Sequence, residues 1–170
     1  GIGCAESGSS MKIIGFHNSD EEYGFLSNWY PTVFYIRGQR FTSMEQYMMY
    51  RKAKLFQDLS AANLILQTND VAEIKKLGRK VHGYDDLYWN GVRQLVVYEG
   101  LLEKFSQNAD LKEELLNTGD AILAECAVKD RIWGIGLSMN DPNRLDITKW
   151  LGKNLLGYAL MMARDHFNEE

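Results

Sequence analysis

The spacing of apolar residues along the chain predicts a mainly helical protein. The longest predicted helix covers Asp85–Ser106, where apolar side chains recur at helical intervals and would form one buried face. A second helix is predicted to follow Thr42 and to reach about Phe56, because Thr42 and Glu45 match the N-cap and third helical position of a capping box. The same reasoning predicts four further helices, over Ala61–Gln67, Asp70–Leu77, Leu111–Leu116 and Thr148–Phe167.

Four shorter segments have the composition of strands. Lys12–His17 and Ala121–Cys126 are short apolar runs. Thr32–Ile36 and Gln39–Phe41 lie on either side of Gly38, which is typical of a hairpin because glycine readily adopts a positive φ. No linker divides the chain. The pattern therefore predicts an α+β fold, a mostly helical single domain with a small β-sheet.

The first ten residues differ in composition from the rest of the chain. We interpret residues 1–10 (GIGCAESGSS) as a disordered tail or an expression remnant, and residues 11–170 as the folded domain, opening at Met11. A first residue that is glycine, with Cys4 nearby, is also found at the acylated N-termini of some proteins. However, Ala5 occupies the position where the myristoylation pattern requires Ser or Thr.

Composition and charge exclude several classes of function. The net charge of −4 and the pI of about 5.4 argue against a broad electrostatic grip on duplex nucleic acid, although a local basic pocket for a phosphate stays compatible with them. The two cysteines form no CxxC motif and no Cys/His cluster, so neither a zinc site nor a disulfide scaffold is expected. No apolar run is long enough to span a membrane. We expect a cytoplasmic protein.

The first candidate for chemistry is the helix that follows Thr42. Glu45 and Lys52 lie seven residues apart, so they share one helix face and could form a catalytic pair of a carboxylate and an ammonium group. The alternative is that Glu45 only completes the capping box and that Lys52 is a solvated surface charge. The sequence leaves both open.

The second candidate is the loop DRIWGIG, residues 130–136. Asp130 could act as a base or bind ribose hydroxyls, and Trp133 could stack on a planar base. Gly134 would let the backbone approach a ligand closely. The alternative is an ordinary turn with its tryptophan in the core.

Two cationic segments could bind phosphate. Lys153 and Asn154 lie near the start of the last predicted helix, and helix N-termini bind phosphate well. The glycines of this segment, GKNLLG, could instead allow close packing. Arg79 follows Gly78 near the predicted end of another helix, where Gly78 would otherwise be a simple C-cap.

In chain order, these segments resemble the NADAR (YbiA-like) family. The resemblance covers about Ile14 to Arg164. It is carried by L-S-N-W at Leu26–Trp29, F-T-S-x-E-x-Y at Phe41–Tyr47 with Lys52, L-G-R at Leu77–Arg79, Y-W at Tyr88-Trp89, D-x-x-W-G-x-G at Asp130–Gly136, and G-K-N-x-L-G-x-x-L-M at Gly152–Met161. Two departures stand out: Gln46 stands where the family often has His, and residues 137–149 match poorly.

The resemblance implies a compact, mostly helical α+β fold and an N-glycosidase activity without a cofactor or metal. Family members act on ribosylamino-pyrimidine phosphates of riboflavin synthesis, or remove ADP-ribose from guanine bases in nucleic acid. The implied catalytic residues are Glu45, Lys52, Asp130 and Trp133, and the implied substrate-binding residues are Asn28, Arg79, Trp89, Gly134, Lys153 and Asn154.

We therefore expect a substrate that contains ribose phosphate or ADP-ribose, with ADP-ribosylated guanine as the first choice and ADP-ribosylated nucleic acid as a partner. A rival from another class is a binding module for NAD or ADP-ribose that does no chemistry. The paired carboxylates and Lys52 argue against this rival, because a binder needs no paired acids.

Overall fold

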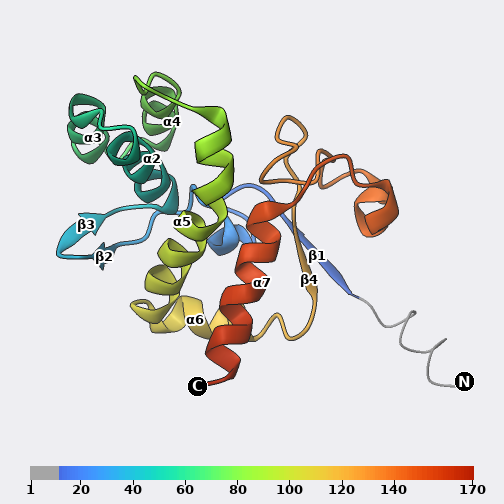
Figure 1. The fold of residues 1–170 in the computed structure, drawn as a ribbon. Coiled ribbons are helices and arrows are strands. Elements are labelled where there is room, and N and C mark those ends of the chain that lie inside the picture. Colours follow the sequence, from blue (N-terminus) through green and yellow to red (C-terminus); the bar gives the residue numbers. More distant parts are fainter. Residues whose placement is uncertain (1–11) are drawn as a thin grey trace, which may run out of the picture.

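The computed structural model describes residues 12–170, so the tail expected over residues 1–10 lies outside the described part. The described part is mostly helical with small sheets, as the sequence predicts (Figure 1). The α-helices are α2 (Met44–Leu55), α3 (Leu59–Leu66), α4 (Val71–Arg79), α5 (Asp86–Ser106), α6 (Ala109–Leu116) and α7 (Leu155–Asn168). The strands are β1 (Ile13–Phe16), β2 (Phe34–Ile36), β3 (Gln39–Phe41) and β4 (Ile122–Glu125), and short 3-10 helices cover Gly24–Leu26, Pro142–Leu145 and Ile147–Lys149.

The strands form two separate pairs rather than one sheet. β2 and β3 are an antiparallel hairpin whose turn places Arg37 and Gly38 at positive φ, which confirms the predicted hairpin. β1 and β4 pair in parallel, with Ile13 opposite Ile122. At the far end of the pair Phe16 lies opposite Glu125, and the imidazole of His17 lies 3.7 Å from the carboxylate of Glu125.

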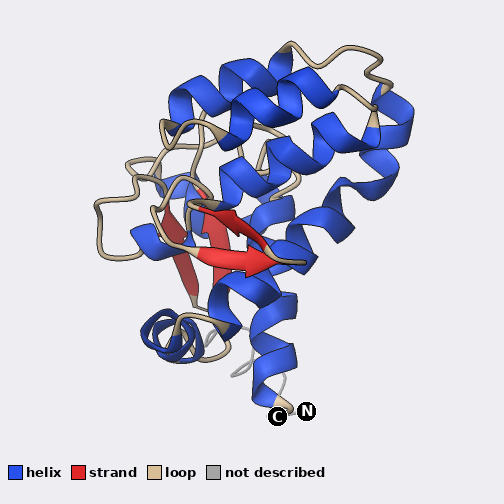
Figure 2. Ribbon diagram, turned by 90° about the vertical axis from the view of Figure 1, so that its left-hand side faces the viewer, coloured by secondary structure: helices blue, strands red, loops and turns tan. Residues whose placement is uncertain are grey.

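The helices pack around α2 and α5. α2 contacts α3, α4 and α5, and α7 contacts both α5 and β4. Figure 1 shows α2, α3 and α4 grouped at one end of the molecule, and β1 and β4 beside α7 at the other. Figure 2 shows helices on two opposite sides of the strands. No helix among residues 12–170 is long and apolar enough to cross a membrane.

The capping box of α2 lies one residue later than predicted. Ser43 is the N-cap, since its hydroxyl accepts the backbone N–H of Gln46 at 3.1 Å. Gln46 in turn accepts the backbone N–H of Thr42 at 2.8 Å, and its amide group donates to the carbonyls of Ile65 and Thr68. The prediction that Thr42 and Glu45 form the capping box is therefore wrong. The carboxylate of Glu45 has no part in the cap.

Gly78 is a packing contact rather than the predicted C-cap. It lies within α4, which ends at Arg79, and it faces α2. A Cβ at Gly78 would come within 1.9 Å of the Sδ of Met49. Only a residue without a side chain lets the two helices approach this closely. The close approach brings the charged face of α4 next to the start of α2.

The last helix begins at Leu155, seven residues later than the predicted start at Thr148. Thr148 belongs to the 3-10 helix Ile147–Lys149. Asn154 has a φ of 53°, a left-handed conformation that a continuous right-handed helix cannot contain. The residues before α7 instead form backbone hydrogen bonds with the loop that follows β4.

Candidate active site

Glu45 lies buried in the first turn of α2. Its side chain and backbone are only 5% exposed, and its backbone N–H donates to the carbonyl of Asn28 at 2.9 Å. Burial raises the pKa of Glu45 to about 7, and the negative charge of Asp130 acts in the same direction. The positive charges of Lys75, Lys52 and Arg79 oppose this rise. Glu45 is therefore a buried carboxyl group poised to exchange a proton near neutral pH.

Three cations surround Glu45 without pairing with it. Lys52 comes from α2, and Lys75 and Arg79 lie four residues apart on α4. Among residues 12–170, no nitrogen of a lysine, arginine or histidine lies within 4.0 Å of the Glu45 carboxylate. Lys75 was not among the residues predicted from the sequence, although its charge has the largest effect of the three on the pKa of Glu45. Its four-residue spacing from Arg79 shows that the two share a face of α4, but not that this face lies beside α2.

Lys52 is a half-buried amine beside an aromatic ring. Its Nζ lies 4.4 Å from the centroid of the Tyr84 ring. Burial lowers the pKa of Lys52, while the negative charges of Glu45 and Asp86 act against this shift. A larger share of neutral amine at physiological pH makes Lys52 a better nucleophile than a solvated lysine.

Asp130 supplies a second carboxylate from the loop after β4. Its Oδ1 accepts the backbone N–H groups of Ile132 at 2.9 Å and Trp133 at 2.8 Å, which fixes the turn. Its negative charge raises the pKa values of both Glu45 and Glu125. The fold therefore brings Asp130 close enough for its charge to act on Glu45, 85 residues away along the chain.

The loop that carries Asp130 is locked against the segment before α7. The backbone N–H groups of residues 151 and 153–156 donate to carbonyls of residues 131–135. Gly134 is buried, and a Cβ there would come within 2.8 Å of the carbonyl of Glu125. A Cβ at Gly152 would come within 2.2 Å of the Gly134 carbonyl. These glycines thus serve close backbone packing.

Asn154 and Lys153 are placed differently from the expected phosphate site. The side chain of Asn154 is fully buried, accepts the N–H of Glu125 and donates to the carbonyl of Leu123. Lys153 is exposed, and its backbone N–H donates a hydrogen bond to the carbonyl of Arg131. The first two amides of α7, those of Leu155 and Leu156, already donate to carbonyls of the loop after β4, so they are not free to bind an anion.

Trp133 is half-buried and lies against a buried arginine. The Cζ of Arg93 is 5.9 Å from the centroid of the Trp133 ring, and Arg93 donates to the Oδ1 of Asn90 at 2.6 Å. Arg93 was not among the site residues that the sequence predicted, and it did not stand out from the pattern of its helix. Trp89, which was among the predicted residues, is 5% exposed and packs within the hydrophobic core.

Asn28 completes the surroundings of Glu45. It is 7% exposed, and its Oδ1 has no hydrogen-bond donor among residues 12–170. The fully buried Lys104 of α5 fixes the segment just before Asn28, since its Nζ donates to the carbonyls of Phe25 at 2.7 Å and Ser27 at 3.3 Å. Burial lowers the pKa of Lys104 to about 7. Lys104 thus fixes the loop that positions both Asn28 and the backbone of Glu45.

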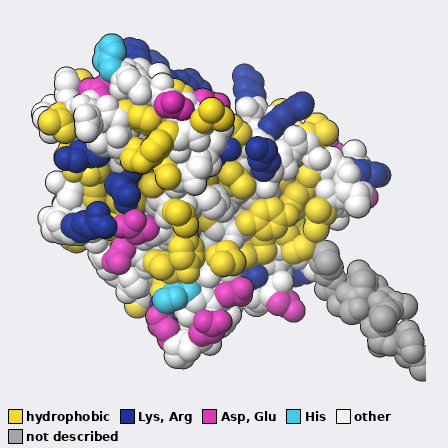
Figure 3. Space-filling view, viewed as in Figure 1, with side chains coloured by type: hydrophobic (Ala, Val, Ile, Leu, Met, Phe, Trp, Pro, Cys, Tyr) yellow, Lys and Arg dark blue, Asp and Glu magenta, His cyan; other side chains and the backbone are white. Residues whose placement is uncertain are grey.

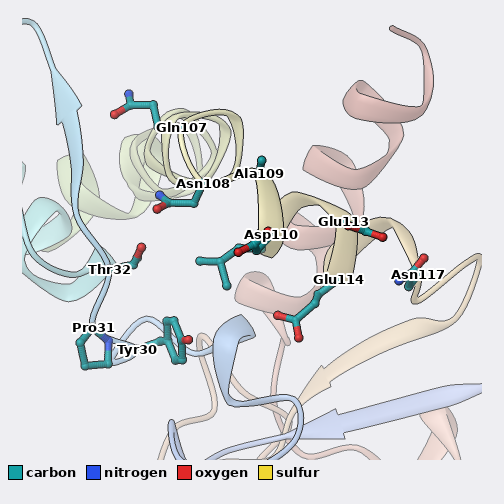
Figure 4. A pocket seen from close by; sticks show the side chains of 11 residues that line it. Tyr30, Pro31, Thr32, Gln107, Asn108, Ala109, Asp110, Glu113, Glu114 and Asn117 are labelled. Carbon is teal, nitrogen blue, oxygen red and sulfur yellow. The ribbon is translucent and has the colours of Figure 1, made fainter.

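One cavity lies away from Glu45. It has a volume of about 780 Å³ and lies between the segment Tyr30–Thr32 and helix α6 (Figure 4). Its lining contains none of the charged residues that surround Glu45. We place the candidate active site at Glu45, because perturbed ionisable groups of opposite charge converge there. The described residues contain no group of three His, Cys, Asp or Glu side chains suited to a metal ion.

Comparisons with known proteins identify the family of this chain. Residues 15–168 match the family model of the NADAR domain. The chain is 38% identical over 162 residues to an N-glycosidase of Acanthamoeba polyphaga mimivirus, with 91% of this chain and 95% of the relative covered. It is 34% identical over 156 residues to a riboflavin biosynthesis protein of Vibrio vulnificus, with 92% of this chain but 39% of that longer protein covered.

A solved structure agrees as well. The NMR structure of the E. coli protein YbiA matches with a TM-score of 0.77 at 28% identity, over 93% of this chain and 86% of that chain. The match of the family model to nearly the whole chain, the similarity to the mimivirus N-glycosidase and the shared fold lead to one conclusion: the chain belongs to the NADAR family of N-glycosidases.

Proposed function

We propose that this NADAR-family N-glycosidase removes ADP-ribose from guanine bases by hydrolysing the bond between the base and the ribose. The observation that carries the proposal is the buried carboxyl group of Glu45, whose pKa is raised to about 7 and which faces the charges of Asp130 and Lys52. Cleavage of such a bond passes through a sugar with oxocarbenium character, which needs a carboxylate for the cation or the water.

The residues take the following roles in this proposal. Ionised Glu45 polarises the attacking water, and Asp130 stabilises the positive charge that develops on the sugar. Trp133 contacts the base or the ribose. Asn28 and Arg79 bind polar groups of the substrate, whereas Trp89, Gly134 and Asn154 shape the site from within the fold. Lys153 lies at its outer edge.

Exposed cations beside Asp130 favour a nucleic-acid substrate. Lys129 and Arg131 flank Asp130 in the sequence, and the backbone N–H of Lys153 donates to the carbonyl of Arg131. The side chains of these three cations are exposed. Figure 3 shows Lys and Arg side chains gathered over the loops between β4 and α7. Cations at the rim of the site could hold the phosphates of a strand that presents a modified guanine.

The alternative substrate is a ribosylamino-pyrimidine phosphate. The observation in its favour is the similarity to the Vibrio vulnificus riboflavin biosynthesis protein, of which this chain covers 39%. Such a small metabolite would need no cations at the rim. A module that binds ADP-ribose without cleaving it would need neither Glu45 ionisation nor Asp130.

Incubation with the two substrates should separate these possibilities. We expect ADP-ribosylated guanosine, free or within an oligonucleotide, to release ADP-ribose, and a ribosylamino-pyrimidine phosphate to release little free sugar. The reaction should survive EDTA, because side chains supply all the groups that it needs. Chromatography of the products measures both rates. Hydrolysis of the pyrimidine compound alone would support the alternative, and binding without release would support the binding module.

Lys52 is expected to form a covalent adduct with the released sugar. Once the glycosidic bond is broken, the ribose opens to an aldehyde at C1. The neutral amine of Lys52 can condense with this aldehyde, forming a C=N bond and losing water. Borohydride added during turnover would reduce that bond to a stable secondary amine. Mass spectrometry should then find the sugar on the peptide that contains Lys52.

The matched control is Lys54, an exposed lysine on the same helix. We expect the adduct to survive in Lys54→Ala and to vanish in Lys52→Ala. An adduct that persists in Lys52→Ala would move the nucleophile elsewhere. Slow turnover of Lys52→Ala without an adduct in the wild type would leave Lys52 a purely electrostatic role.

A further inference from the structure

Arg93 is a buried cation without a counter-ion. It is 6% exposed, and none of the ion pairs among residues 12–170 includes it. Its Nη1 donates to Asn90, but its Nε is buried with no acceptor. Burying an arginine is costly unless its charge is paired and its donors are satisfied. An N–H donor without an acceptor, such as Nε of Arg93, is well suited to bind an anionic group of a ligand.

Arg93 lies next to the loop of the proposed active site that carries Asp130 and Trp133. Its guanidinium group lies 5.9 Å from the centroid of the Trp133 ring. The backbone N–H of Trp133 is held by Asp130, the second carboxylate of the site. Arg93 therefore borders the loop that carries the proposed chemistry.

A chain of contacts connects Arg93 to the other side of the site. Asn90 donates to the Oδ2 of Asp86 at 3.3 Å, and the hydroxyl of Tyr84 donates to the Oδ1 of Asp86 at 2.7 Å. The ring of Tyr84 in turn lies beneath the Nζ of Lys52. The start of α5 thus forms one wall of the site, with Lys52 at one end and Arg93 with Trp133 at the other.

We propose that Arg93 is the phosphate-binding residue of this site and that it recognises the phosphate attached to the substrate ribose. The inference rests on the proposed function. A guanidinium group presents several N–H donors in one plane, which suits two phosphate oxygens at once. Asn90 holds Nη1, whereas Nε has no acceptor among residues 12–170 and would donate to the ligand.

Arg164 shows why burial alone does not identify the phosphate site. It is 5% exposed and belongs to no ion pair among residues 12–170. Its Nη1 donates to the hydroxyl of Thr118. Burial lowers the pKa of Arg164, and the negative charges of Asp165 and Asp120 partly offset this lowering. No contact links Arg164 to Trp133 or Lys52. It is therefore a matched control for the loss of a buried arginine.

The test removes the phosphate from the substrate and the guanidinium from the protein. The substrates are ADP-ribosyl-guanosine, the phosphoribosyl-guanosine left when its pyrophosphate is cleaved, and the ribosyl-guanosine left when the last phosphate is removed. We expect Arg93→Gln to raise KM about 10- to 100-fold for the two phosphorylated substrates, because a charged hydrogen bond contributes at this level. KM for ribosyl-guanosine should hardly change. Arg164→Gln should change all three KM values alike.

Calorimetric titration with ADP-ribose measures binding apart from catalysis. Arg93→Gln should bind it about 10- to 100-fold more weakly, and Arg93→Lys should recover part of the loss. Should Arg93→Gln fail to fold, Asn90→Ala leaves the guanidinium in place without its anchor and should weaken ADP-ribose binding severalfold. Equal losses on all three substrates, or unchanged ADP-ribose binding, would overturn the proposal. Absence of hydrolysis by the wild type, with Arg93-dependent binding intact, would instead count against the proposed function.

Discussion

Glu45→Gln is expected to hydrolyse substrate at least about a hundredfold more slowly than the wild type, while it still folds and binds ADP-ribose. The change keeps the shape of the side chain but removes its charge. General-base and electrostatic roles of a buried carboxylate are worth about a hundredfold or more in rate. Because Ser43 and Gln46 form the helix cap, no loss of capping accompanies the change.

The pH dependence of the reaction gives a second readout. Glu45 must be ionised to polarise water, so kcat/KM should rise with pH through about 7, where burial places its pKa. In Glu45→Gln this rise should disappear. Glu73→Gln is the matched control, since Glu73 is an exposed acid in the first turn of α4. A Glu45→Gln variant with close to the wild-type rate would leave Glu45 without a catalytic role.

The same variant should be more stable than the wild type above neutral pH. The folded protein holds the proton of Glu45 up to a pKa of about 7, whereas the unfolded chain releases it near the ordinary value of 4.5. Folded molecules therefore bind more protons between these values, and the free energy of unfolding falls as pH rises through this window. Glu45→Gln removes this loss, which amounts to at most about 3 kcal/mol. Urea denaturation at pH 5 and pH 8 measures it.

The helices were predictable because their signals are local. The start of α5 follows the cap Asp85, and the hairpin follows from the glycine at its turn. The capping box was misplaced by one residue because Thr42-x-x-Glu45 and Ser43-x-x-Gln46 both fit the pattern. Only tertiary contacts decide between them: the amide of Gln46 also binds the end of α3.

The active site was predictable only in part, because its walls come from distant segments. Glu45 and Lys52 share a helix face, which sequence spacing shows directly. Lys75 reaches them because Gly78 lets α4 approach α2, and no local pattern reports a contact between helices. Arg93 is one polar residue in a long amphipathic helix, so its burial depends on the loop that carries Trp133. The phosphate site expected at Lys153 and Asn154 was not predictable from local pattern, because their backbone N–H groups donate to carbonyls of Arg131 and Gly134, about 20 residues earlier in the sequence.

Asp130→Asn is expected to lower turnover about a hundredfold and to shift the remaining pH profile towards lower pH. Asparagine keeps the Oδ1 that accepts the N–H groups of Ile132 and Trp133, so the loop should retain its shape. The lost charge removes the stabilisation of a cationic sugar. It also removes a negative charge that raises the pKa of Glu45, so Glu45 should ionise at lower pH.

Asp130→Ala separates charge from loop shape. It loses the charge and the acceptor together, so it should be at least as slow and also less stable by about 1 kcal/mol, the usual contribution of such a side-chain to backbone bond. Asp141→Asn is the matched control, because the Oδ1 of Asp141 accepts the N–H of Asn143 in a similar turn elsewhere. Rates across the pH range and thermal melting of all three variants give the result. If Asp130→Asn keeps the wild-type rate and pH profile while Asp130→Ala loses stability, Asp130 only shapes the loop, and Glu45 is the sole acid of the mechanism.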